Sequence, residues 1–137
     1  MPNPQSPLHV ALSKVGDRWT LQVIDSLLAG PRRFGDLQDD VAGIAPNTLS
    51  SRLKALEGEG LVIARSYSER PPRFEYTLTA SGKELAGAIS LLAAWGSGHS
   101  DEAEVPRHGL CGTPLEVRWY CPTCDREATQ SEEAWDI

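Results

Sequence analysis

Cysteine is missing from the first 110 residues of this 137-residue chain, and all three cysteines lie close to its C-terminal end. An odd number of cysteines gathered at one end argues against a disulfide framework and favours a metal site there. No apolar run approaches the roughly 18 residues that a membrane-spanning helix needs. The opening segment MPNPQSPLH has neither a basic cluster nor an apolar stretch, so we expect no secretory signal and a cytoplasmic protein.

The chain also lacks the common catalytic signatures. It contains no P-loop, no dinucleotide-binding fingerprint and no nucleophile elbow. A zinc deaminase needs H-x-E followed by P-C-x-x-C, but here His108 is followed by Gly-Leu, and Pro122 comes after Cys121 instead of before it. We therefore expect a protein that is not an enzyme.

A net charge of -6 appears to oppose nucleic-acid binding, but the charge is unevenly distributed. Residues 1–100 hold ten Lys and Arg and ten Asp and Glu, whereas residues 101–137 hold three Arg and nine Asp and Glu. All of the excess acid therefore lies at the C-terminal end. The neutral remainder is free to carry a basic face, so the net charge excludes no DNA-binding function.

Apolar periodicity and turn residues predict a mainly α fold with a small β hairpin, an α+β winged helix-turn-helix. The length suits one domain with a small appended module. A break near Gly16 separates the first two helices, with Asp17 as N-cap of the second, and a short third helix ends at Gly43. The other predicted elements are a fourth helix from Pro46 to Gly58 or Gly60, strands at 61–64 and 74–78 joined by the polar segment 65–73, and a last helix that opens at 79–82.

The fourth helix and the hairpin carry the candidate DNA contacts. Leu49, Leu53 and Leu56 form one apolar stripe, so the polar side chains of this helix point outward. Short polar side chains on an outward face suit the approach of a helix to base edges in the major groove. Prolines stiffen the hairpin tip, where two arginines are placed to reach flanking DNA. The candidate contacts are Arg32, Arg33, Asn47, Thr48, Ser50, Ser51, Arg52, Lys54, Arg70 and Arg73.

A solvated helix exterior would also be polar, so no single one of these residues identifies a DNA-binding surface. The arrangement as a whole favours DNA, because the outward face carries no acid from Asn47 to Ala55 and a basic hairpin follows it.

Four motifs occur in order along the chain: GDRWT from Gly16, GPRRFGDL from Gly30, LSSRLKALE from Leu49 and PPRFEYTLT from Pro71. Together they resemble the HxlR-type winged helix-turn-helix regulators, relatives of the MarR group, over about residues 8–96. The resemblance implies a homodimeric transcription factor whose N-terminal and last helices form the dimer interface. Two recognition helices would then read a pseudo-palindromic operator about one helical turn apart.

One departure from that family is clear. Many members carry a cysteine near the start of the first helix, and some use it to sense oxidants or electrophiles. The absence of cysteine from Met1 to Leu110 excludes such a thiol switch in the winged-helix domain of this chain.

An acidic linker at 97–106 leads into residues 107–137, which we call the tail. The tail holds H-x2-C, nine residues, and then C-x2-C, a pattern that resembles a zinc ribbon. Four such ligands predict a closed, structural Zn²⁺ site that stabilises a module too small to build its own core. The predicted ligands are His108, Cys111, Cys121 and Cys124.

Alternatives to this zinc site stay open at this point. His108 is the weakest ligand, and a surface histidine there would leave the fourth position to His99, to water or to nothing. Cys121 and Cys124 alone would also suit a redox pair.

The leading hypothesis is a sequence-specific double-stranded-DNA-binding transcriptional regulator, a homodimeric repressor. It uses helix 46–58 in the major groove and wing 65–73 on flanking DNA. The alternative is a protein-interaction or metal-responsive module in which the tail is the functional element. A small-molecule effector is a further option, because Trp19, Trp95, Phe34 and Tyr67 would line a pocket if they are not simply part of the core.

Overall fold

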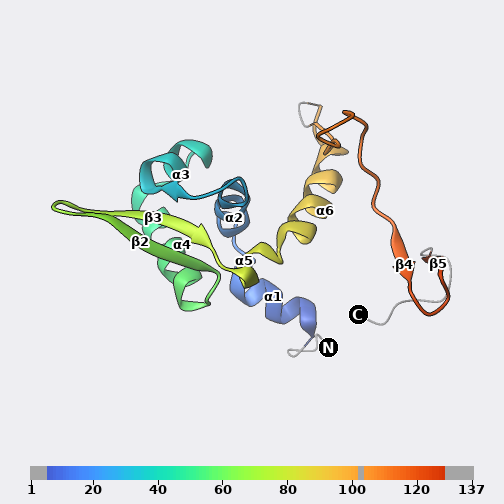
Figure 1. Cartoon of the computed structure of the whole chain (residues 1–137), viewed down its shortest axis with the longest axis horizontal. Helices are drawn as coiled ribbons and strands as arrows, with labels where there is room; N and C mark the ends of the chain where they lie inside the picture. Colours follow the sequence, from blue (N-terminus) through green and yellow to red (C-terminus); the bar gives the residue numbers. More distant parts are fainter. Residues whose placement is uncertain (1–5, 102–103, 129–137) are drawn as a thin grey trace. The chain divides into compact units, whose positions relative to one another are not determined.

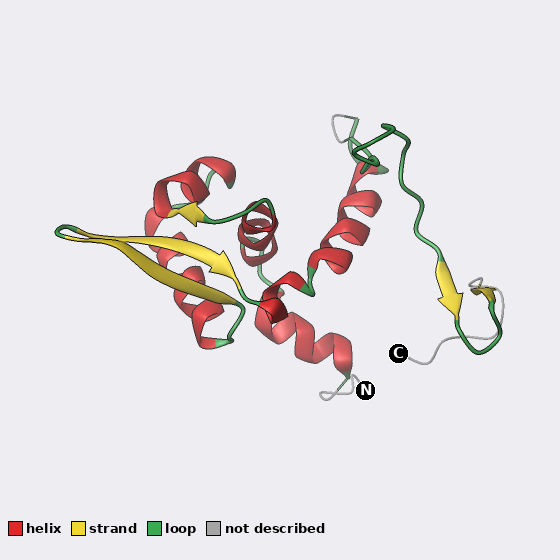
Figure 2. Cartoon of the chain, in the orientation of Figure 1, coloured by secondary structure: helices red, strands yellow, loops and turns green. Residues whose placement is uncertain are grey.

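The computed structural model describes residues 6–101 and 104–128, so the last part of the predicted tail, 129–137, lies outside the described residues. It divides into two compact units, Met1–Ile89 and Ser90–Ile137. No helix among the described residues is long and apolar enough to cross a membrane. The elements are α1 (Pro7–Val15), α2 (Thr20–Leu28), β1 (Arg32–Arg33), α3 (Phe34–Asp40), α4 (Pro46–Gly58), β2 (Val62–Glu69), β3 (Pro72–Leu78), α5 (Ala80–Lys83), α6 (Ala86–Ser97), β4 (Trp119–Cys121) and β5 (Arg126–Ala128) (Figures 1 and 2).

The core of the first unit lies between α2, α3, α4 and the base of the sheet. The stripe predicted for α4 is fully buried, with Leu49, Leu53 and Leu56 at most 1% exposed. Ile24 from α2 and Leu37 from α3 pack into the same cluster. Burial of one helix face fixes the direction of the other, so the core sets the orientation of the outward residues of α4.

A long antiparallel hairpin projects from this core, and we call residues 62–78 the wing (Figure 2). Its strands run further than the sequence predicted, because they continue through the polar segment and leave only Arg70 and Pro71 at the tip. Tyr67 lies in an irregularity of the register between Ser66 and Ser68, which corresponds to a β-bulge.

The sheet has a third strand that the sequence did not predict. β1 consists of Arg32 and Arg33 and pairs with Tyr76 and Glu75 of β3, so the strand order is β1-β3-β2. This pairing ties the segment before α3 to the wing.

The break between the first two helices is confirmed, but α2 begins later than predicted, at Thr20. Asp17 still satisfies the start of the helix, since its carboxylate accepts hydrogen bonds from the backbone N–H of Trp19 at 2.9 Å and of Thr20 at 3.1 Å. The third helix also ends earlier than predicted, at Asp40 instead of Gly43.

The prediction of one continuous last helix from residue 79 is wrong, because the structure has two helices, α5 and α6. Thr79 caps α5, where its hydroxyl oxygen accepts a hydrogen bond from the N–H of Gly82 at 3.1 Å and its O–H donates one to the carbonyl of Gly60 at 2.7 Å. Gly82 is buried against the carbonyl oxygen of Leu61. These contacts anchor α5 at the base of the wing, and α5 ends at Lys83 before α6 begins at Ala86.

The second unit contains most of α6 and the small hairpin β4–β5. A single bridge joins Arg107 and Pro114 in the segment between them. Leu115, Val117 and Trp119 are about half exposed, so the apolar side chains of the tail form no buried core among the described residues.

Candidate nucleic-acid interface

The outward face of α4 is polar and carries no acid in its first turn. Ala45 is extended and Pro46 opens the helix, which places Asn47 at the second helical position. Asn47, Ser51 and Lys54 are exposed, whereas Thr48 and Ser50 are partly buried at its edges. The predicted direction of these side chains therefore agrees with the structure.

Arg52 differs from its neighbours because it turns back toward the body of the domain. Its Nε lies 3.6 Å from a carboxylate oxygen of Asp17, and this nitrogen is buried without a hydrogen-bond partner. About 38% of the side chain stays exposed. Arg52 thus links α4 to the start of α2, and its contact with DNA stays a prediction.

Asp17 is the acceptor at the centre of this link. Burial alone would raise the pKa of Asp17, but hydrogen bonds from the Thr20 hydroxyl and from the N–H groups of Trp19 and Thr20, together with the charge of Arg52, lower it overall. The ionised carboxylate therefore joins two helices, which sequence periodicity did not reveal because residues 17 and 52 are far apart in the chain.

The wing presents its arginines to solvent. Arg70 lies at the tip and Arg73 in the register opposite Ser68, and both are exposed. Within the described ranges neither guanidinium forms an ion pair. Unpaired guanidiniums on a projecting hairpin are suited to bind phosphate oxygens, since no internal partner has to be released first.

Arg32 and Arg33, predicted as phosphate contacts, have internal partners. The Nε of Arg32 lies 3.2 Å from Asp40, and the Ser26 hydroxyl together with this guanidinium lowers the pKa of Asp40. The guanidinium of Arg33 lies 4.4 Å from the centre of the Tyr67 ring, a cation–π contact between β1 and the wing. The structure thus gives each arginine a structural role beside the predicted one.

In the tail, the four predicted zinc ligands form two separate pairs. The Nδ1 of His108 lies 3.2 Å from the Sγ of Cys111, and the turn between them is closed by a hydrogen bond from Gly112 to the His108 carbonyl. Cys121 ends β4, and the backbone N–H of Cys124 is the main cause that lowers the pKa of the Cys121 thiol.

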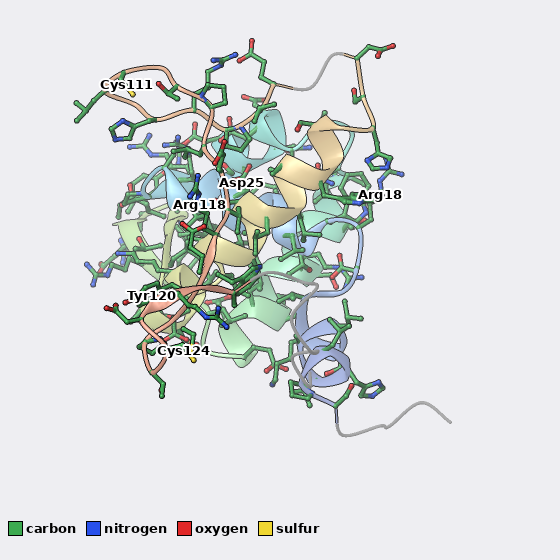
Figure 3. The ribbon with its side chains drawn as sticks, turned by 90° about the vertical axis from the view of Figure 1, so that its right-hand side faces the viewer. Arg18, Asp25, Cys111, Arg118, Tyr120 and Cys124 are labelled. Carbon is green, nitrogen blue, oxygen red and sulfur yellow. The ribbon has the colours of Figure 1, made fainter. Side chains whose placement is uncertain are left out.

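The two pairs do not meet in one cluster. In the part of the chain that the structure describes, no three His, Cys, Asp or Glu side chains gather as a metal site would require, and Figure 3 shows Cys111 and Cys124 toward opposite ends of the tail segment. Thr113, first through its side chain and then through its backbone, and the ring of His108 lower the pKa of the Cys111 thiol to about 7. The alternative ligand His99 stacks on Trp95 with ring centroids 4.2 Å apart.

Comparison with known proteins places this fold among helix-turn-helix transcriptional regulators. The profile described as HxlR-like helix-turn-helix matches residues 14–104. A curated relative, an uncharacterised HTH-type transcriptional regulator of Mycobacterium tuberculosis, is 42% identical over 123 residues, which cover 87% of this chain and 77% of the relative. Only 13 residues precede Lys14, so this alignment must continue past the family match and include part of the tail.

Solved structures agree with this assignment. A protein described as a MarR-family transcriptional regulator from Porphyromonas gingivalis superposes with a TM-score of 0.66 at 31% identity and covers 70% of this chain and 94% of its own. The reduced form of the transcriptional regulator YodB from B. subtilis has a TM-score of 0.59 at 30% identity and covers 73% of this chain and 99% of its own.

Proposed function

Since the chain belongs to the HxlR-like helix-turn-helix family and is a DNA-binding transcription regulator, we propose that it acts as a homodimeric repressor in the cytoplasm. Each protomer inserts α4 into the major groove of one half of a pseudo-palindromic operator. The wing binds the flanking DNA. The proposal assigns the protein no catalytic role.

One observation carries this proposal: the outward face of α4, which is free of acidic residues from Asn47 to Ala55, lies in the same compact unit as a wing whose tip arginines are unpaired among the described residues. The N-terminal residues of a recognition helix contact base edges, and Asn47 has that position in α4. Asparagine pairs with adenine through two hydrogen bonds, so we assign sequence discrimination to Asn47 and electrostatic affinity to Arg70 and Arg73.

The first test measures binding to the DNA upstream of the gene by fluorescence anisotropy over a range of salt concentrations. Arg73→Ala removes one phosphate contact per protomer, so the slope of log K against log salt should fall by about 1.8 for a dimer. Lys83→Ala is the matched control, since it removes one exposed cation from α5 at the opposite end of the hairpin (Figure 1). Equal slopes for the two variants would show that Arg73 of the wing does not bind a DNA phosphate.

The second test concerns base recognition. Asn47→Ala should lower affinity for the operator about tenfold while affinity for unrelated DNA stays nearly constant, because a lost base contact does not affect phosphate binding. A uniform loss on all sequences would instead make Asn47 a backbone contact. In transcription assays, added protein should reduce transcription from a promoter that carries an intact operator. Transcription from a promoter with a scrambled operator should stay unchanged.

Exposed apolar side chains support the dimer. Leu8 and Leu12 of α1 are 60% and 55% exposed, and Trp95 of α6 is 67% exposed. Such residues are commonly covered by a partner. Leu12→Glu should shift the protein toward monomer in sedimentation equilibrium, whereas Gln22→Glu, which adds the same charge on the exposed face of α2, should not.

For the tail we propose a structural Zn²⁺ held by His108, Cys111, Cys121 and Cys124. The pair His108 and Cys111 suits this role, because two ligands of a tetrahedral zinc lie about 3.5 Å apart for bonds of about 2.0–2.3 Å, and the observed separation is 3.2 Å. When bound, the metal would supply folding energy by joining the two pairs. The tail would otherwise have little apolar burial to hold it.

Metal analysis of the purified full-length chain should find about one zinc per protomer. Cys124→Ser should abolish tight binding. His108→Ala should weaken it while His99→Ala should not, and the reverse result would identify His99 as the fourth ligand. Absence of zinc from protein prepared without chelators would reject the site, and the alternative of a tail that acts as an interaction module would then gain weight.

A further inference from the structure

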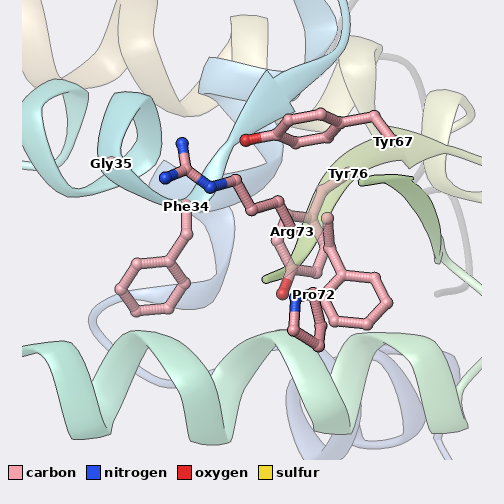
Figure 4. A pocket seen from close by; sticks show the side chains of 7 residues that line it. Phe34, Gly35, Tyr67, Pro72, Arg73 and Tyr76 are labelled. Atoms are coloured by element: carbon pink, nitrogen blue, oxygen red, sulfur yellow. The ribbon is translucent and has the colours of Figure 1, made fainter. Parts of the chain in front are cut away.

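A pocket of about 300 Å³ lies between the first turn of α3 and the wing (Figure 4). Four aromatic rings surround it, with Gly35 at one edge and Arg73 across it. This volume falls at the lower end of cavities that hold small organic molecules. All of the lining residues belong to the first compact unit, so the pocket is a feature of a single protomer. The rings are Phe34, Tyr67, Phe74 and Tyr76.

The rings of this aromatic pocket are not closed off from water. Tyr67 and Phe74 both line the pocket, yet they are 43% and 45% exposed. Flat aromatic faces left in water gain free energy when another apolar ring covers them. The lining therefore favours a ligand with a planar aromatic body.

The polar part of the pocket is positive. Arg73 extends across it toward Phe34 and the start of α3 (Figure 4). No acidic residue lines the pocket, and Arg73 has no ion-pair partner among the residues described. Arg33 lies against the Tyr67 ring and adds a second positive charge nearby. A free guanidinium binds a carboxylate with two parallel hydrogen bonds, and a single carboxylate fits the limited volume beside the rings.

Gly35 in the first turn of α3 also lines the pocket. A Cβ built at this position would meet no atom within 4 Å, and its φ lies outside the left-handed region, so the backbone does not require glycine there. A larger side chain at Gly35 would thus enter the pocket without straining the helix. The position offers a direct way to fill the pocket and leave Arg73 intact.

We propose that the aromatic pocket binds a planar aromatic monocarboxylate of one or two rings, with the carboxylate on Arg73. Its ring lies against Phe34, Tyr67 and Phe74. Because one guanidinium cannot pair with a ligand carboxylate and a DNA phosphate at the same time, the bound ligand weakens operator binding. Binding depends on the pocket alone, whereas the effect on DNA rests on the proposed function.

The test uses 2-naphthoate as the probe and follows the backbone amides of the full-length protein by two-dimensional NMR. The amides of Gly35, Tyr67 and Phe74 should shift in a saturable manner. The neutral 2-naphthamide should bind about tenfold more weakly, because it cannot form the charge-assisted pair. Shifts that map elsewhere, or equal affinities for the two probes, would overturn the assignment.

Two variants separate filling of the pocket from loss of the charge. Gly35→Leu should weaken naphthoate binding at least tenfold, and Arg73→Gln about tenfold. Gly58→Leu is the matched control, since a Cβ there also meets no atom within 4 Å and Gly58 does not line the pocket, so binding should be unchanged. Naphthoate binding by Gly35→Leu equal to that of the wild type would refute the site.

Operator binding is measured last, with and without naphthoate. Saturating probe should lower the operator affinity of the wild type several-fold and that of Gly35→Leu hardly at all. If the probe binds in the pocket and operator affinity stays constant, the competition is refuted. If no DNA binds under any condition, the proposed function fails, and the NMR result still decides whether the pocket binds the carboxylate.

Discussion

Replacement of Gly82 by alanine tests how α5 is joined to the wing. A Cβ at Gly82 would lie 2.2 Å from the carbonyl oxygen of Leu61 and 3.0 Å from a methyl group of Leu78. The carbonyl belongs to the backbone and accepts a hydrogen bond from the N–H of Thr79 at 3.0 Å, so it cannot rotate away as a side chain would. The alanine must therefore displace α5 from the sheet.

The magnitude follows from three effects. Overpacking of a close contact costs about 1–3 kcal/mol, and weakening of the Thr79 hydrogen bond adds about 1 kcal/mol. Alanine regains about 1 kcal/mol relative to glycine in a helix. We expect Gly82→Ala to lower the free energy of unfolding by about 2 kcal/mol, which lowers the Tm by roughly 10 °C for a domain of this size.

Urea and thermal unfolding, followed by circular dichroism at equal protein concentrations, measure this difference. The control is Gly58→Ala at the end of α4, where the new Cβ meets no atom within 4 Å. This control should be neutral or up to about 1 kcal/mol more stable, because only the helix propensity changes. A free energy of unfolding for Gly82→Ala within about 0.5 kcal/mol of the wild type would refute the packing argument.

Two further predictions concern the core and the start of α2. Leu53→Ala should lower the free energy of unfolding by about 2–5 kcal/mol in the same assay, because Leu53 is fully buried on the core side of α4. Asp17→Asn should reduce stability at neutral pH. The folded pKa of Asp17 lies below its usual value of 3.8, so its charge stabilises the fold above that pH, and this contribution disappears as the pH falls through the folded value. The variant should therefore lose less stability than the wild type between about pH 5 and pH 2, and parallel pH profiles for the two proteins would contradict this assignment.

The sequence predicted α4 and the wing well because their signals are local. Three leucines on one face, Pro46 at the start and Gly58 at the end are enough to place a helix, and the structure has the same bounds. The hairpin was also found, since β-rich runs flank a polar segment. Its strands were predicted too short because charged and small residues such as Arg65 and Ser66 continue the pairing without a strand signal of their own.

Features that depend on distant contacts were missed. β1 is two arginines that become a strand only because β3 pairs with them. The break between α5 and α6 was missed because the apolar pattern continues through it, and the packing of Gly82 on Leu61 exists only in the folded chain. The link between Asp17 and Arg52 and the gathering of aromatic rings beside α3 likewise require the folded chain.

The irregularity at Tyr67 also affects the solubility of the molecule. In the order β1-β3-β2, strand β2 forms an outer edge of eight residues, and an edge of that length is a template for strands of other chains. The bulge interrupts the regular spacing of backbone donors and acceptors along this edge, and the charges of Arg65 and Glu69 flank the interruption. The wing can therefore be long enough to reach DNA without offering a straight edge for self-association into larger sheets.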